Sequence, residues 1–133
     1  MKYLLAFVRD RDQMFESTEE EMRKGMEAWN DFNREAADAG VMIANEALEL
    51  PNTAKTVRIA EGGEASVTDG PFAETKEQLG GFCLIDCEGL EEAMAWAKKV
   101  PLGPGGAIEV RAVKDLTPYG YRDVGVGTVQ AKA

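Results

Sequence analysis

The order of its strand-like and helix-like segments predicts that this chain forms an α+β fold. Two segments have the three- and four-residue periodicity of amphipathic helices, and apolar strand-like segments precede, separate and follow them. The order is strand, helix, strand, hairpin, helix, strand. This is the split βαβ, or ferredoxin-like, pattern βαββαβ with an extra hairpin, in which both helices lie on one face of an antiparallel sheet.

The first half of the chain supplies a strand and a helix. Residues 2–9 form an apolar run that ends at the charged turn 10–12, which predicts a strand. Ser17 and Thr18 are followed three residues later by Glu20 and Glu21, the spacing of a capping box. A helix is therefore expected to begin near residue 19, to reach about residue 39, and to end at Gly40.

One face of this helix is apolar. The spacing favours packing against a core over a groove for a cofactor or partner. The face consists of Met22, Met26, Trp29, Phe32 and Ala36.

The remaining elements follow from short apolar runs and turn residues. Predicted strands cover residues 41–47, 55–60, 64–68, 81–87 and 107–113, and the second of them alternates as a half-buried strand does. Gly62 and Gly63 predict a hairpin turn. Residues 90–99 have a helical apolar face that ends in two lysines.

The predicted domain covers residues 1–114, and residues 115–133 are expected to form a C-terminal tail. Apolar periodicity fades after Asp115, although Tyr119 and Tyr121 provide side chains that can dock on the domain or on a dimer partner.

Both sides of the first strand are apolar. Tyr3, Leu5 and Phe7 alternate with Leu4, Ala6 and Val8. Two helices on one face of a sheet leave the other face without cover, so a second copy of the chain is the simplest cover for it. A homodimer is therefore expected.

Composition excludes several classes of partner. The chain has 133 residues and a net charge of −9, which disfavours nucleic acid and anionic membrane surfaces. No apolar run approaches the roughly 20 residues of a membrane span, and the first ten residues lack a signal-peptide cleavage site. The expected compartment is the cytoplasm.

The chain contains no histidine, which removes histidine-based nucleophile pairs, general bases and metal ligands. No metal site and no cofactor are predicted. Cys83 and Cys87 fall on the same face of a strand, about 13 Å apart, too far to form a disulfide. Buried free thiols are expected.

Residues 67–82, VTDGPFAETKEQLGGF, contain the main candidate site residues. Asp69 either accepts amide hydrogen bonds in its own turn or faces a pocket as a general base. Glu74 and Lys76 either form a solvated loop surface or provide a base and an ammonium group that binds anions. Phe72 is expected to anchor the loop by burial.

A second group of candidates lies on predicted strands. If Ile108, Val110 and Ala112 face the helices, then Glu109 and Arg111 face the uncovered side. These two residues, and Arg58, are candidate ligand contacts because charges that face a semi-enclosed space need partners. The alternative is a salt bridge within the chain or across a dimer.

The sequence resembles the DGPF subgroup of the YCII-related (YciI-like) family over about residues 1–113. The matching segments are MKYLLAF, GVMIANEAL, VTDGPFAETKEQLGGF, EEAMAWA and GGAIEVRAV. The resemblance implies a dimeric α+β barrel. Some members carry a histidine–aspartate pair proposed as an acid–base site, and Asp69 alone matches that proposal by motif.

The resemblance also bears on function. One activity known among relatives is the processing of a halogenated aromatic ring. Family members of the DGPF type tend to be associated with extracytoplasmic-function sigma factors. The leading hypothesis is a protein that binds a small polar or anionic metabolite and catalyses a proton-transfer-led elimination, isomerisation or hydrolysis. Asp69 and Glu74 would be catalytic, and Lys76, Arg111, Glu109 and Arg58 would bind substrate. The alternatives are a non-catalytic regulatory or interaction module with a protein partner, and a scaffold whose ancestral site was lost with its histidine.

Overall fold

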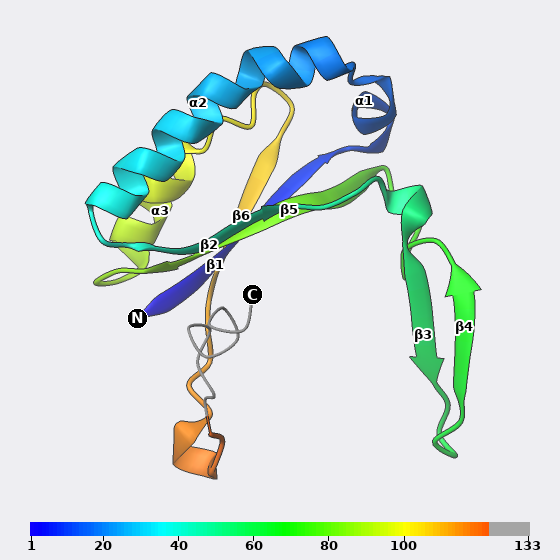
Figure 1. Ribbon diagram of the computed structural model, residues 1–133. Coiled ribbons are helices and arrows are strands. Elements are labelled where there is room, and N and C mark those ends of the chain that lie inside the picture. The colour runs from blue at the N-terminus through cyan, green and yellow to red at the C-terminus, as the bar shows by residue number, and fades with distance from the viewer. Residues whose placement is uncertain (123–133) are drawn as a thin grey trace, which may run out of the picture.

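Four antiparallel strands form the main sheet, in the order β2-β5-β1-β6, in the computed structural model, which describes residues 1–122 (Figure 1). The strands are β1 (Lys2–Asp10), β2 (Met42–Ala47), β5 (Glu77–Asp86) and β6 (Ala107–Ala112). The helices are α1 (Arg11–Glu16), α2 (Glu19–Asp38) and α3 (Leu90–Lys99). Strands β3 (Lys55–Ile59) and β4 (Ala65–Asp69) form a separate two-stranded sheet, and two 3₁₀ turns, η1 (Pro51–Thr53) and η2 (Thr117–Tyr119), complete the described elements. The predicted α+β class is confirmed.

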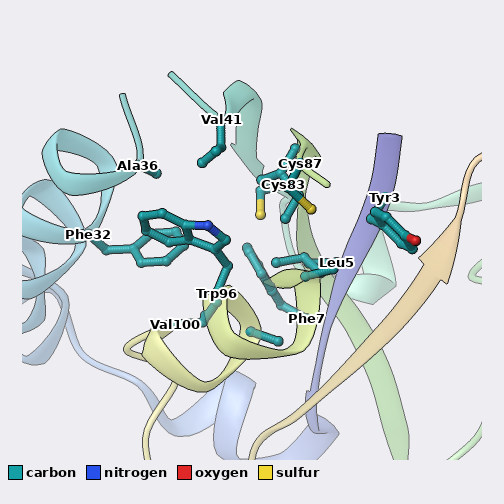
Figure 2. Close-up of a cluster of buried hydrophobic side chains, with 13 residues drawn as sticks. Tyr3, Leu5, Phe7, Phe32, Ala36, Val41, Cys83, Cys87, Trp96 and Val100 are labelled. Carbon is teal, nitrogen blue, oxygen red and sulfur yellow. The ribbon is translucent and has the colours of Figure 1, made fainter. Parts of the chain in front are cut away.

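The core lies between β1, β5 and the two long helices. Tyr3, Leu5 and Phe7 on one side of β1 are almost fully buried, and Leu5 is opposite Cys83 of β5. Figure 2 shows Leu5 and Phe7 on the side of Trp96 of α3, whose ring lies 6.3 Å from that of Phe32 of α2 in an edge-to-face arrangement. The alternation of β1 therefore places one row of apolar residues in the core and the other on the uncovered face, as the sequence predicts.

Local signals set the ends of α2. The Thr18 side chain accepts a hydrogen bond from the Glu21 amide, and the Glu21 carboxylate accepts one from the Thr18 amide, so the predicted capping box is confirmed. Gly40 has a φ of +73° just after the helix, a conformation in which a side chain would be strained.

The predicted turn at residues 10–12 is instead the start of α1. Asp10 acts as its N-cap and accepts a hydrogen bond of 2.9 Å from the amide of Asp12. The apolar residues of this short helix are Met14 and Phe15, and only Met14 is buried, so its sequence contains too little periodicity to be recognised.

The apolar face of α2 is only partly core, which corrects the expectation from its spacing. Phe32 and Ala36 are buried, but Met22 and Met26 are 54% and 48% exposed. Periodicity identifies the face of a helix but not how far along its length the sheet extends beneath it.

The β3–β4 hairpin projects away from the sheet, on the side opposite the helices (Figure 1). The prediction that β3 is half-buried is wrong: Val57 and Ile59 are 58% and 68% exposed. The predicted turn is confirmed, and Gly63 takes a φ of +89° there. Alternating apolar and polar residues predict a strand with two different faces. They do not show whether another layer of the fold covers the apolar face.

Strand β5 begins earlier than predicted, at Glu77, so Gly80 and Gly81 lie inside the strand. A Cβ atom on Gly81 would lie 2.7 Å from the carbonyl oxygen of Glu46 and 3.2 Å from Cδ2 of Phe7. Glycine at position 81 is therefore needed for the close approach of β2 to β5.

Gln78 fixes the loop between β4 and β5. Its side chain is 8% exposed, and Nε2 donates hydrogen bonds to the carbonyl oxygens of Ala73 and Thr75, at 3.1 and 3.0 Å. Phe72, which was expected to anchor this loop, is 77% exposed, so that expectation is wrong. The buried amide of Gln78, and not the ring of Phe72, holds this loop in place.

Cys83 and Cys87 are both free and buried, as predicted. Burial raises the pKa of the Cys83 thiol to about 12, so this residue remains a neutral thiol at physiological pH. It is a core residue.

Replacing Gly81 with Ala is expected to lower the free energy of unfolding by about 1–3 kcal/mol, because the new methyl group meets backbone atoms of β2. Gly25→Ala in α2 is the matched control: its Cβ meets no atom within 4 Å, and loss of a mid-helix glycine should stabilise the protein by about 0.5–1 kcal/mol. Urea denaturation measures both. Equal stability of Gly81→Ala and the wild type would contradict the close approach of the two strands.

Replacing Gln78 with Met, which is similar in size and has no amide, should destabilise the protein by about 1–2 kcal/mol. The loop carbonyls lose their donors, so faster cleavage of residues 70–76 by a protease is also expected. The exposed Gln13→Met serves as control. Unchanged cleavage in Gln78→Met would show that the amide does not hold the loop.

Candidate functional site

A cavity of about 390 Å³ lies at the base of the hairpin, and we call it the turn cavity. Segments that are distant in sequence form its walls: α1, the η1 turn, the loop after β4 and the start of β5. The polar side chains that line it are Arg11, Asn52, Asp69, Glu74 and Gln78. The fold thus brings two predicted catalytic carboxylates to one cavity.

Asp69 is the last residue of β4 and pairs with Lys55 of β3. Its carboxylate accepts a 2.5 Å hydrogen bond from Lys55 Nζ, and its side chain is 86% exposed. The turn is instead held by the Gly70 amide, which donates to the carbonyl of Ala54, and by the Thr56 hydroxyl, which donates to the carbonyl of Gly70, both at 2.7 Å. Within residues 1–122, Asp69 therefore does not form the Asx turn that its sequence allows. Its carboxylate pairs with Lys55 instead.

Glu74 folds back over the turn. Its Oε1 atom lies 3.6 Å from the position that a Cβ atom on Gly70 would occupy, and Gly70 has a φ of +93°. In the part of the chain that the structure describes, no lysine or arginine pairs with the Glu74 carboxylate. Glu74 is therefore the carboxylate of the turn cavity that is free to accept a proton or a ligand hydrogen bond.

Arg11 provides the positive charge of the turn cavity. Its amide donates a 2.7 Å hydrogen bond to the Lys76 carbonyl, which ties α1 to the loop. Its Nε lies 3.9 Å from the Asp12 carboxylate, a weak contact that leaves the outer guanidinium nitrogens available. Arg11 was not among the predicted site residues, because residues 10–12 were expected to form a turn. The signal for a helix there is Asp10, a residue type that is common as an N-cap.

Gln78 contributes a carbonyl oxygen. Its Nε2 is used by the loop, and within residues 1–122 no donor reaches its Oε1. Every fully buried side-chain oxygen in this part of the chain has a partner, so Oε1 retains access to solvent where Gln78 lines the turn cavity. Asn52, on η1, adds an amide from the other wall.

Lys76 and Arg58 lie beside the turn cavity but do not line it. Lys76 Nζ is 3.7 Å from the Asp10 carboxylate, and Arg58 donates a 2.8 Å hydrogen bond to the Phe72 carbonyl. Both side chains connect the loop to neighbouring elements.

Glu109 and Arg111 lie on β6, at the edge of the sheet opposite β2. Arg111 donates to both carboxylate oxygens of Glu109, at 3.0 and 3.1 Å, so this pair forms a salt bridge along one strand. It lies opposite Ala6 and Leu4 of β1, on the uncovered face. Neither residue lines the turn cavity.

Residues 1–122 contain no group of three or more Asp, Glu, Cys or His side chains placed to hold a metal ion. None of their helices has both the length and the apolar character needed to cross a membrane.

Comparison with known proteins gives the chain a family. The YCII-related domain matches residues 1–117. Uncharacterized protein R00369 of Rhizobium meliloti (strain 1021) is 37% identical over 120 residues, which span 89% of this chain and 96% of the relative. The match includes the sheet, both long helices and the loop that forms the turn cavity. The chain therefore belongs to the YCII-related family.

Proposed function

We propose that this protein binds a small polar or anionic metabolite in the turn cavity and catalyses a reaction that begins with proton transfer. The observation that carries the proposal is that Asp69, Glu74 and Arg11 line the same cavity. An arginine beside two carboxylates can hold an anionic group of a ligand while one carboxylate removes a proton from it.

The roles divide according to the contacts of each residue. The outer nitrogens of Arg11 bind an oxyanion, and Glu74, which has no cationic partner within residues 1–122, is the general base. Asp69 is held by Lys55 and orients the ligand. The amide groups of Asn52 and Gln78 recognise neutral polar groups. Elimination and isomerisation begin with removal of a proton from the ligand by such a base, and hydrolysis begins with removal of a proton from a water molecule.

Glu74→Gln should preserve binding but slow proton transfer by about 10²–10⁴-fold, because the amide cannot act as a base. The measurement is a thermal-shift screen of small carboxylates and phosphate esters, followed by NMR of solvent deuterium exchange into each bound compound. Arg11→Gln should weaken binding by about tenfold or more.

Glu61→Gln, at the exposed hairpin turn, and Arg34→Gln, on the outer surface of α2, are matched controls and should behave as the wild type. If binding and exchange in the Glu74→Gln and Arg11→Gln variants both equal those of the wild type, the turn cavity is not the site. Binding without exchange in the wild type would favour the non-catalytic regulatory module, with or without a link to sigma-factor signalling.

We also propose that the protein forms a homodimer through the uncovered face of the sheet. Support comes from the side chains that alternate with the core row: Leu4 and Val8 of β1 and Phe82 and Leu84 of β5 are partly exposed, and Leu79 is 46% exposed. All three described helices lie on the other side (Figure 1). A second copy would bury this apolar surface and would enclose the Glu109–Arg111 pair.

Leu84→Glu should convert the dimer into a monomer, because it places a charge in the middle of the proposed interface. Analytical ultracentrifugation measures the mass, and circular dichroism checks that the fold is retained. Met94→Glu, an equal change on the helical side, where Met94 is 41% exposed, is the control. A wild-type monomer at micromolar concentration would refute the dimer.

A further inference from the structure

A second cavity, of about 570 Å³, lies between the first half of α2 and the sheet, and we call it the helix cavity. Figure 1 shows α2 passing over the end of the sheet where β1 leads into α1. The apolar walls of the cavity include Phe7, Met14, Met22, Met26, Trp29 and Leu48. This volume is typical of small-molecule sites, which measure about 300–1,000 Å³. The apolar side chains share the lining with polar ones, among them Arg9 and Glu21. No residue lines both this cavity and the turn cavity.

The helix cavity begins where the packing of α2 against the sheet ends. Phe32 is 4% exposed and Ala36 is fully buried, whereas Met22 and Met26, on the same face, are about half exposed. Methionine side chains are flexible and polarisable, and they adapt to the shape of an apolar ligand. The first half of α2 therefore has the composition of a binding wall.

Gly25 lies on the same face, three residues after Met22 and four before Trp29. A Cβ atom there would meet no atom within 4 Å, and Gly25 lines the cavity. Glycine in the middle of a helix costs stability relative to alanine, and no close contact requires it here. Position 25 therefore borders open volume, which a larger side chain can fill without a clash.

Arg9 provides the positive charge in the helix cavity. It lies on β1 two residues after Phe7, is partly buried, and lines the cavity. Within residues 1–122, its guanidinium group has no hydrogen-bond acceptor or ion-pair partner. A guanidinium that is partly removed from water is stabilised by an anion placed against it.

The acidic residues that line the helix cavity narrow the choice of anion. Glu21 is occupied by the capping box, with 3.3 and 3.1 Å contacts to Thr18. Glu46 and Glu49 are exposed, and neither pairs with Arg9. Their negative charge disfavours polyanions such as nucleotides, and the single guanidinium favours a single carboxylate.

We infer that the helix cavity binds an amphipathic monoanion, namely a carboxylate on an alkyl or aryl body. The carboxylate contacts Arg9, and the apolar body lies among Met14, Met22, Met26 and Trp29. This site is separate from the proposed reaction at the turn cavity, so each can be tested without the other.

The test is an NMR titration of the full chain, labelled at its methionine methyl groups, with octanoate below its micelle concentration. Met14, Met22 and Met26 line the helix cavity, while Met94 lies exposed on α3. Saturable shifts confined to the three cavity methionines are expected, and 1-octanol, which lacks the charge, should bind at least about tenfold more weakly.

Two variants test the two halves of the ligand. Gly25→Leu should abolish the shifts by filling the cavity, while circular dichroism and thermal unfolding show a folded protein. Arg9→Gln should weaken octanoate by about tenfold or more but leave 1-octanol unchanged. Arg34→Gln, whose arginine pairs with Asp31 at 2.8 Å, is the matched control.

Three outcomes would overturn the inference. They are the absence of saturable shifts at the three cavity methionines, equal shifts at Met94, and wild-type octanoate binding in both Gly25→Leu and Arg9→Gln. Binding that is lost in Gly25→Leu but is equal for octanoate and 1-octanol would leave an apolar cavity and refute the role of Arg9.

Discussion

The packing of one side of β1 against two helices is the interaction on which the rest of the structure depends. Leu5 is fully buried, Tyr3 and Phe7 are 4% exposed, and all three belong to one buried cluster with Phe32 and Trp96. Burying each such side chain contributes about 1.5–3 kcal/mol. Because β1 lies between β5 and β6, this one row fixes the register of the sheet and the side on which α2 and α3 lie.

Both cavities lie at the limits of this packing. Toward its N-terminus α2 extends beyond the buried part of the core, and the space beneath it forms the helix cavity. The β3–β4 hairpin follows β2 and precedes β5 in the chain. At its base, α1, η1 and the loop after β4 meet to form the turn cavity. A close-packed interior has little room for ligands, so these edges are where binding is to be sought.

Part of the candidate site could be predicted from the sequence. Asp69 and Glu74 belong to a short segment dense in turn-forming and ionisable residues, and they line one cavity. Glu109 and Arg111 were equally plausible by alternation, yet they bind each other at the far edge of the sheet. Arg11 could not be selected, because its role depends on a short helix with little periodicity and on a loop many residues away.

The sequence by itself determined the features that depend on neighbours along the chain. These are the order of elements, the capping box at Thr18, the helix stop at Gly40 and the two-sided apolar character of β1. Only the tertiary structure decided that Met22 and Met26 line a cavity, that the hairpin projects from the sheet, and that Asp69 pairs with a lysine. The physical reason is that hydrogen-bond spacing and periodicity are local properties. Burial and charge pairing depend on which distant segments the fold brings together.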